Sequence, residues 1–175
     1  MNWKKLKEKT VYKGWRGIVQ KTFELPNGKT ATFDVVQMSN FVTIVAFTKN
    51  KEAILVKQYR PGAEMVMTSF PEGRIEKGEN PKLAAARELL EETGYQAREF
   101  VLLKKFKAAY TTQTQICLLA IDCKKVKDQQ LDATEFIDVF LLPIEKFRSL
   151  LTNVEDNSFH NVATGYLALE YMGWL

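Results

Sequence analysis

The chain contains very little histidine and cysteine. Its 175 residues include one histidine, His160, and two cysteines, Cys117 and Cys123. A single histidine makes both a Ser-His-Asp hydrolase and a histidine-based metal centre poor explanations of this chain. The two cysteines stand six residues apart in an apolar, strand-like run, which fits no zinc or redox spacing. We therefore expect both cysteines to pack in the core as free thiols, which suits a reducing cytoplasm.

Long apolar runs and dense basic runs are also missing. No apolar stretch nears the roughly 20 residues of a membrane-spanning helix. The most basic stretch, MNWKKLKEK, lacks the apolar segment of a signal peptide. The net charge is +4, but no Lys/Arg run is dense enough for a nucleic-acid patch. We therefore expect neither a membrane nor a nucleic acid as a partner. The composition, 46% hydrophobic and 26% charged, indicates one globular domain with at most a small appendage.

The segment from Gly73 to Tyr95, GRIEKGENPKLAAARELLEETGY, carries the clearest signals. Asn80 is a good N-cap, and Pro81 occupies the first helical position, where its missing N–H costs nothing. Gly94 suits a left-handed stop behind the helix. The pattern predicts a helix over residues 81–93.

Three carboxylates crowd the last turns of this predicted helix. Glu88 shares a face with Glu91 at i+3 and with Glu92 at i+4. Each like-charge pair costs a few tenths of a kcal/mol on an exposed helix, roughly, and the helix dipole opposes the carboxylates too. Arg87 relieves part of this repulsion through Glu91 at i+4. A bound Mg²⁺ or Mn²⁺ would relieve more, because both ions prefer oxygen ligands. The alternative is a solvated acidic helix end.

The spacing of the whole segment resembles the Nudix box, G-x5-E-x7-R-E-U-x-E-E-x-G-U, in which U is a bulky apolar residue. Every fixed position is filled, by Gly73, Glu79, Arg87, Glu88, Glu91, Glu92, Gly94 and the apolar Leu89 and Tyr95. The resemblance implies a Nudix hydrolase with an α/β fold: an α/β/α sandwich around a mixed β-sheet.

The order of elements agrees with that fold. Residues 14–38 read as an antiparallel pair of strands turning at Pro26-Asn27-Gly28. Further strands are predicted at 42–48, 53–58, 97–107, 115–123 and 136–141, and helices at 81–93, 143–151 and 162–172. Residues 59–72 read as loop and short strand, and residues 124–134 as a polar loop.

Three further segments resemble the ADP-ribose and nucleotide-sugar pyrophosphatase branch of the family. They are Lys57–Arg60 (KQYR), Phe70–Gly73 (FPEG) and Glu135–Val139 (EFIDV). The first 40 residues resemble the small N-terminal antiparallel sheet of that branch. We therefore expect an N-terminal β subdomain over 1–40, for dimerisation and base binding, and a Nudix domain over 41–175.

The chain also departs from that branch. Ser69 stands where the branch usually has Glu, and Glu72 where it usually has Ala. The region past the box, Tyr110–Gln113, lacks the proline that many ADP-ribose enzymes carry. These departures favour a nucleoside diphosphate linked to a sugar over ADP-ribose itself.

The resemblance assigns roles to individual residues. Metal ligands would be the carboxylates of Glu88, Glu91 and Glu92 with the backbone carbonyl of Glu72, and Glu91 and Arg87 also count among the catalytic residues. Gly73, Glu79 and Arg87 would hold the loop and orient the ligands. The general base would be Glu135, with Asp132 as the alternative. Arg60 would clamp phosphate oxygens, and Trp15 and Arg16 would bind the base.

The resemblance also implies a homodimer with exchanged N-terminal sheets. Residues 14–38 carry Trp15, Val19, Phe23, Phe33 and Val35, which is much apolar surface for a small appendage. Two other functions remain open: hydrolysis of nucleoside triphosphates or RNA 5′ ends, and a non-catalytic module that binds nucleotide sugars.

Overall fold

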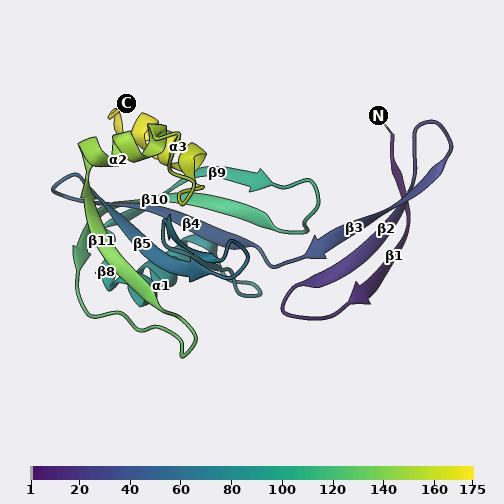
Figure 1. Ribbon diagram of the computed structural model, residues 1–175, viewed down its shortest axis with the longest axis horizontal. Helices are drawn as coiled ribbons and strands as arrows, with labels where there is room; N and C mark the ends of the chain where they lie inside the picture. Colours follow the sequence, from purple (N-terminus) through teal and green to yellow (C-terminus); the bar gives the residue numbers. More distant parts are fainter. Residues whose placement is uncertain (1) are drawn as a thin grey trace. The chain divides into compact units, whose positions relative to one another are not determined.

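The chain forms two compact units in the computed structural model, which describes residues 2–175 (Figure 1). The first unit contains the chain up to Asn40 together with Phe106–Gln115, and the second contains Phe41–Lys105 and Ile116–Leu175. Residues 106–115 lie within the range expected for the second domain. They group with the first unit because Val36 donates to the carbonyl of Tyr110 (2.9 Å) and accepts from the N–H of Thr112 (3.0 Å).

The first unit is built on a three-stranded antiparallel sheet in the order β1-β2-β3. Its strands are β1 (Lys4–Tyr12), β2 (Gly17–Glu24) and β3 (Thr30–Gln37). The predicted hairpin corresponds to β2 and β3. Strand β1 was missed, because all nine of its residues are exposed and no apolar alternation marks it. It is a strand because it pairs with β2.

Apolar contacts hold this small sheet together. Val19 and Val35 lie opposite each other on β2 and β3, and both are buried. Trp3 packs against Phe23 and Phe33, with ring centroids 5.9 and 5.8 Å away. The unit therefore has a minimal core of its own, as a three-stranded sheet needs.

The second unit is the expected α/β/α sandwich with a mixed sheet, and this prediction is confirmed. The main path of the sheet runs β11-β5-β4-β10-β8, with β6 on β5, β7 on β4 and β9 on β10. The strands are β4 (Phe41–Thr48), β5 (Glu52–Arg60), β6 (Met65–Ser69), β7 (Glu72–Arg74), β8 (Tyr95–Gln96), β9 (Glu99–Lys107), β10 (Thr114–Lys125) and β11 (Ile137–Pro143). The helices are α1 (Pro81–Thr93), α2 (Ile144–Thr152) and α3 (Val162–Met172).

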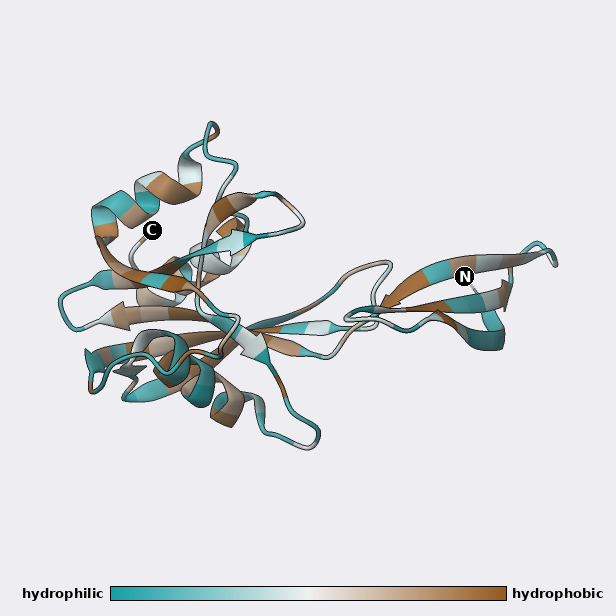
Figure 2. Ribbon diagram, turned by 60° about the horizontal axis from the view of Figure 1, so that its bottom comes forward, coloured by the Kyte–Doolittle hydropathy of each residue, from teal (hydrophilic) through white to brown (hydrophobic). Residues whose placement is uncertain are grey.

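Strand β4 shows why the sheet is covered on both faces. Val42, Ile44 and Ala46 join the core cluster that contains Ala84, Ala85 and Leu89 of α1. Val45 and Phe47 join the cluster that contains residues of α2 and α3. Successive side chains point to opposite faces of a strand, so a strand buried on both faces reads as a continuous apolar run. Figure 2 shows this hydrophobic colour along the inner strands between the helices.

The helices lie close to their predicted bounds. Helix α1 covers residues 81–93 and α3 covers 162–172, as predicted, whereas α2 covers 144–152 and follows Pro143. Within residues 2–175, no helix has the length and apolar character needed to cross a membrane.

Candidate active site

Helix α1 begins and ends through local contacts that the sequence encodes. The side chain of Asn80 accepts the N–H of Lys82 (2.9 Å), and Pro81 follows as the first helical residue. At the other end Gly94 adopts φ +74° and donates its N–H to Leu90 (2.9 Å). These ends place the last two turns, which contain the acidic residues, beside strand β7.

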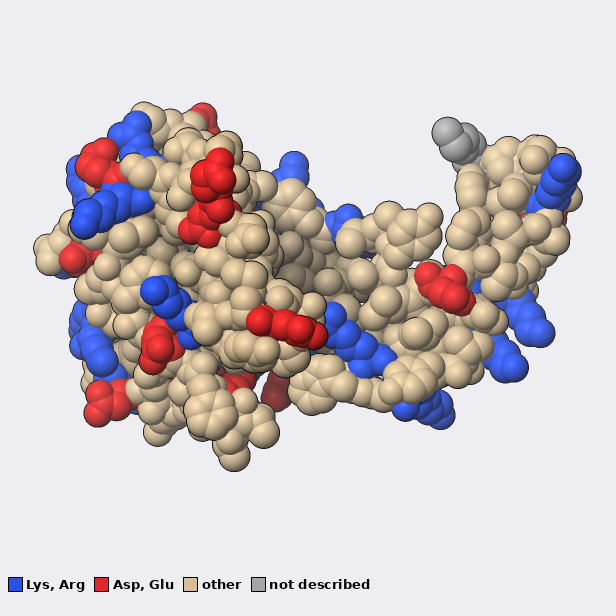
Figure 3. Space-filling model, in the orientation of Figure 1, with Lys and Arg blue, Asp and Glu red and all other residues tan. Residues whose placement is uncertain are grey.

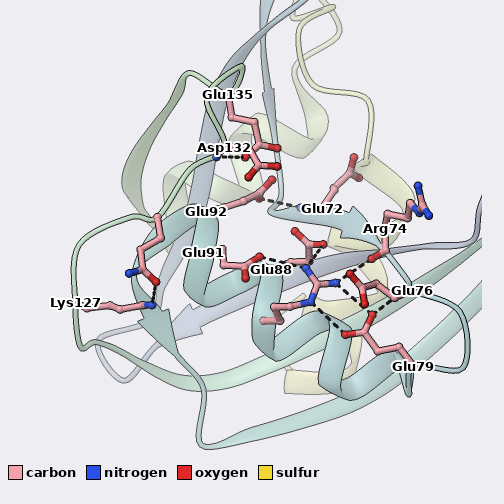
Figure 4. Close-up of polar contacts among 12 residues, drawn as sticks. Glu72, Arg74, Glu76, Glu79, Glu88, Glu91, Glu92, Lys127, Asp132 and Glu135 are labelled. Carbon is pink, nitrogen blue, oxygen red and sulfur yellow. Dashed lines mark hydrogen bonds and ion pairs between the residues drawn. The ribbon is translucent and has the colours of Figure 1, made fainter. Parts of the chain in front are cut away.

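Arg87 links the carboxylates of the helix to the segment before it, through Glu79, Glu88 and Glu91, which are labelled in Figure 4. Its Nε and Nη2 donate to the two oxygens of Glu79, both at 3.2 Å, and Nη1 donates to Glu88 (2.7 Å) and Glu91 (3.2 Å). Nη2 also reaches the carbonyl of Arg74 (3.0 Å). The hydrogen bonds from Arg87 lower the pKa of Glu79. The guanidinium therefore balances part of the negative charge and fixes residues 74–79 against the helix.

Position 73 requires glycine because there is no room for a side chain, and not because of its backbone angles. A Cβ atom at this position would lie 1.7 Å from Cδ of Glu88, which is an impossible overlap. The main chain of β7 thus approaches the Glu88 carboxyl group as closely as a residue without a side chain allows. This contact explains the first glycine of the motif.

The carboxylate of Glu88 is partly buried, and that of Glu92 is buried. Burial raises the pKa of Glu88, although Arg87 acts in the opposite direction, and the charges of Glu91 and Glu135 raise it further. Glu92 is only 8% exposed, and burial raises its pKa well above the ordinary value. The charges of Glu88 and Glu135 add to that effect. Such a concentration of buried negative charge is costly unless a cation compensates it.

The side chain of Glu72 lies on the α3 side of the sheet. Its Oε1 accepts hydrogen bonds from Thr43 Oγ1 (2.9 Å) and from Nδ2 of Asn161 (2.7 Å), the residue before α3. Its backbone contacts α1, because the Glu72 N–H donates to Oε2 of Glu92 (3.1 Å), and the charge of its carboxylate also raises the pKa of Glu92. This arrangement anchors the Glu72 main chain beside Glu92.

The polar loop between β10 and β11 is attached to the C-terminal end of α1. Gly94 accepts the N–H of Val126 (2.9 Å), and a Cβ on Gly94 would lie 2.1 Å from the carbonyl oxygen of Lys127. Glu91 accepts the N–H of Gln130 through its backbone carbonyl (2.9 Å). The last glycine of the motif therefore serves two purposes: it ends the helix and admits this loop.

The same loop presents the two candidates for the general base. Glu135 is half-buried, and its charge acts on both Glu88 and Glu92. Asp132 is exposed, and its backbone N–H donates to Oε2 of Glu135 (3.2 Å). The structure thus brings Glu135 into electrostatic contact with the acidic helix.

The chemistry of this cluster fits a divalent cation with oxygen ligands. Within residues 2–175, no three Asp, Glu, His or Cys side chains form a ready-made metal cluster. The hydrogen bonds show the reason: Arg87 holds oxygens of Glu88 and Glu91, and the Glu72 N–H holds one of Glu92. The buried carboxylates with raised pKa values still supply only hard oxygen donors and uncompensated charge. This is the donor set that Mg²⁺ or Mn²⁺ accepts.

Three predicted substrate residues lie apart from these contacts. Arg60 is the last residue of β5, where it pairs with Met65, and its side chain is half-buried. Trp15 and Arg16 belong to the first unit, in the turn between β1 and β2. Trp15 is 100% exposed, so its ring does not pack against a sheet of the described chain.

Three residues near the cluster were not predicted: Thr43, Gln129 and Asn161. Thr43 is a fully buried polar residue within the apolar run of β4, and this is a signal that sequence reasoning can use. Asn161 directly precedes a predicted helix, which marks a cap but not a partner 89 residues away. Gln129 lies in a polar loop and has no sequence signal.

Comparison with known proteins identifies the family. The model of the NUDIX domain matches residues 39–162 of this chain. The chain therefore belongs to the Nudix family and is a Nudix hydrolase, as the motif predicts. Members of this family generally use divalent metal ions.

Several relatives match most of the chain. An ADP-ribose pyrophosphatase of Bacillus subtilis is 34% identical over 97% of this chain and 94% of its own length. A methanol dehydrogenase activator of Bacillus methanolicus is 31% identical over 85% of this chain and 80% of its own. An ADP-ribose pyrophosphatase of Saccharomyces cerevisiae is 30% identical, over 87% and 77%. Among solved structures, an ADP compounds hydrolase superposes with a TM-score of 0.85 at 25% identity, covering 100% of this chain and 98% of that one.

Proposed function

We propose that this protein hydrolyses the diphosphate of a nucleoside diphosphate sugar, of the ADP-ribose or GDP-mannose type, to a nucleoside monophosphate and a sugar phosphate. The partly buried carboxylate of Glu88, held by Arg87, and the buried carboxylate of Glu92 are the observation that carries the proposal. Relatives named ADP-ribose pyrophosphatase support the substrate class.

The carboxylates of Glu88, Glu91 and Glu92, with the backbone carbonyl of Glu72, would hold Mg²⁺ or Mn²⁺. Such an ion neutralises a diphosphate and lowers the pKa of a bound water. Arg87 and Glu79 orient the ligands, since their paired hydrogen bonds fix the side chains that approach the cluster.

Glu135 would act as the general base. The charge of its carboxylate raises the pKa of Glu92, and the loop that contains Glu135 is hydrogen-bonded to the end of α1. Asp132 is the weaker candidate because its side chain is exposed, whereas the charge of Glu135 acts on both Glu88 and Glu92. A base must reach the attacking water, and a loop position allows that approach.

Arg60 would bind diphosphate oxygens, and Trp15 and Arg16 would bind the nucleobase. The support for Arg60 is its position at the end of β5, adjacent to the strand that leads into the motif. Trp15 is fully exposed, so its ring is available for stacking, and Arg16 follows it in the same turn.

The N-terminal unit would form a homodimer with exchanged sheets. Its exposed residues include Trp3, Leu6, Val11, Tyr12 and Trp15, and a partner subunit would cover such surface. Residues 1–40 also hold eight Lys or Arg against three Asp or Glu, and Figure 3 shows these cations along the unit. Light scattering at micromolar concentration should give about twice the 20.1 kDa chain mass. A fully active monomer would refute both the dimer and a shared site.

We further propose a cytoplasmic location, which the two free, buried cysteines support.

A substrate panel tests the proposed function. The panel contains ADP-ribose, GDP-mannose, UDP-glucose, dGTP and 5′-triphosphate RNA with Mg²⁺. For the sugar-linked diphosphates the phosphate released by a coupled phosphatase is measured; for dGTP and RNA, whose terminal phosphates a phosphatase removes directly, released pyrophosphate or phosphate is measured without it. Activity on the sugar-linked diphosphates supports the proposal. Activity confined to dGTP or RNA would favour the triphosphate alternative, and binding without turnover would favour the non-catalytic module.

A further inference from the structure

The loop between β10 and β11 satisfies the backbone carbonyls at the acidic end of α1. The last four carbonyls of a helix have no partner within the helix. Here Glu91 receives the N–H of Gln130, and Gly94, just past the helix, receives that of Val126. The carbonyl of Glu92 is different, because it receives a side chain: Nε2 of Gln129 donates to it at 2.6 Å.

The amide of Gln129 also makes a second contact. The same Nε2 donates to the carbonyl of Ile137 at 3.0 Å. An amide nitrogen carries two hydrogens, so both bonds can exist together. One side chain therefore ties the end of α1 to the first residue of β11, and residues 130–136 are enclosed between Gln129 and that strand.

Glu135 lies inside the enclosed segment, two residues before Ile137. Its N–H donates to the carbonyl of Asp132 (2.9 Å) and its carboxylate accepts the N–H of the same residue (3.2 Å). These bonds shape the turn, but they do not attach it to the helix. The backbone N–H of Gln130 attaches the loop to Glu91 of the helix, and the Gln129 side chain adds an attachment to the carbonyl of Glu92, whose carboxylate belongs to the acidic cluster.

We propose that Gln129 is a positioning residue for Glu135. It holds the loop at the distance from Glu92 at which the Glu135 carboxylate faces the reacting water, and it does so without touching substrate. This inference rests on the proposed function, in which Glu135 is the general base. Ordering a loop residue costs backbone entropy, so a side chain that closes the loop in advance lowers that cost during the reaction.

The test replaces Gln129 by Met, which has a similar length and no hydrogen-bond donor. Gln130→Met is the matched control, because the Gln130 side chain is exposed and accepts a hydrogen bond from Nζ of Lys127, while its backbone N–H is retained. Both variants are made in the full chain and assayed with ADP-ribose and Mg²⁺. We expect Gln129→Met to lower kcat by about tenfold to a hundredfold with KM within about twofold, and Gln130→Met to match the wild type. Melting curves check that the variants fold, and amide hydrogen exchange should become faster at Gln130 in Gln129→Met.

A double-mutant cycle separates positioning from general stability. If Gln129 acts through Glu135, Gln129→Met should change kcat by less than about twofold in a Glu135→Gln background. Additive losses would overturn the inference, as would a Gln129→Met enzyme that equals the control. A wild type inactive on every diphosphate would instead refute the proposed function, and the inference would fall with it.

Discussion

Replacing Glu92 by Gln should make the metal-free protein more stable while it removes activity. Glu92 is 8% exposed, and burial raises its pKa above the ordinary value of 4.5. The folded state then binds the proton more tightly than the unfolded chain does. Protonated Glu92 therefore contributes to the stability of the folded state. This contribution is fully present below pH 4.5 and is lost as the pH rises through the raised pKa of Glu92. Glutamine resembles the protonated form at every pH, so it keeps that stability.

The size of the effect follows from the burial. One pKa unit corresponds to about 1.4 kcal/mol, and removing a strained site charge commonly gains about 0.5–2 kcal/mol. For a chain of this length that gain raises the melting temperature by about 1–8 °C. The measurement is calorimetry at pH 8 with a chelator present, repeated toward pH 4.5, where the difference between the variant and the wild type should shrink. Turnover with Mg²⁺ should fall by about a hundredfold or more, because the charge that would bind metal is lost.

Glu79→Gln provides a control of opposite sign. The hydrogen bonds from Arg87 lower the pKa of Glu79, so this carboxylate contributes stability above its ordinary pKa, and that stability is lost as the pH falls through the lowered value. The variant should therefore melt below the wild type at pH 8. If Glu92→Gln also melts below the wild type without metal, the charge of Glu92 is not a net cost and the reasoning about the cluster is wrong.

Three other substitutions test neighbouring parts of the site. Gly73→Ala should displace the Glu88 carboxyl group and lower kcat by about a hundredfold, whereas Gly62→Ala, where no atom lies within 4 Å of the added Cβ, should match the wild type; equal activities would remove the packing explanation. Glu135→Gln should lower kcat with little change in KM, and unchanged turnover would move the base elsewhere. Arg60→Ala should mainly raise KM for the diphosphate, and unaltered kinetics would show that Arg60 does not bind phosphate.

The sequence by itself determined the parts whose causes are local. Helix α1 lies at its predicted bounds because Asn80, Pro81 and Gly94 act on neighbouring backbone groups. The pairing of Arg87 with Glu91 follows from the i, i+4 geometry of any helix. The spacing of the motif likewise indicates the family without the fold, because the motif lies within one short stretch of the chain. These features need only the chain near them, so they can be read from it.

Only the tertiary structure decided the features that depend on distant partners. Strand β1 has no buried residue and exists because β2 pairs with it. Glu72 turns toward Thr43 and Asn161, and Gln129 reaches both α1 and β11, across separations that no local pattern records. The raised pKa of Glu92 likewise needs the burial that the folded sheet and loop create. Hydrogen bonding and desolvation act through space, so the carboxylates could be named from the sequence, whereas their partners and their environment required the fold.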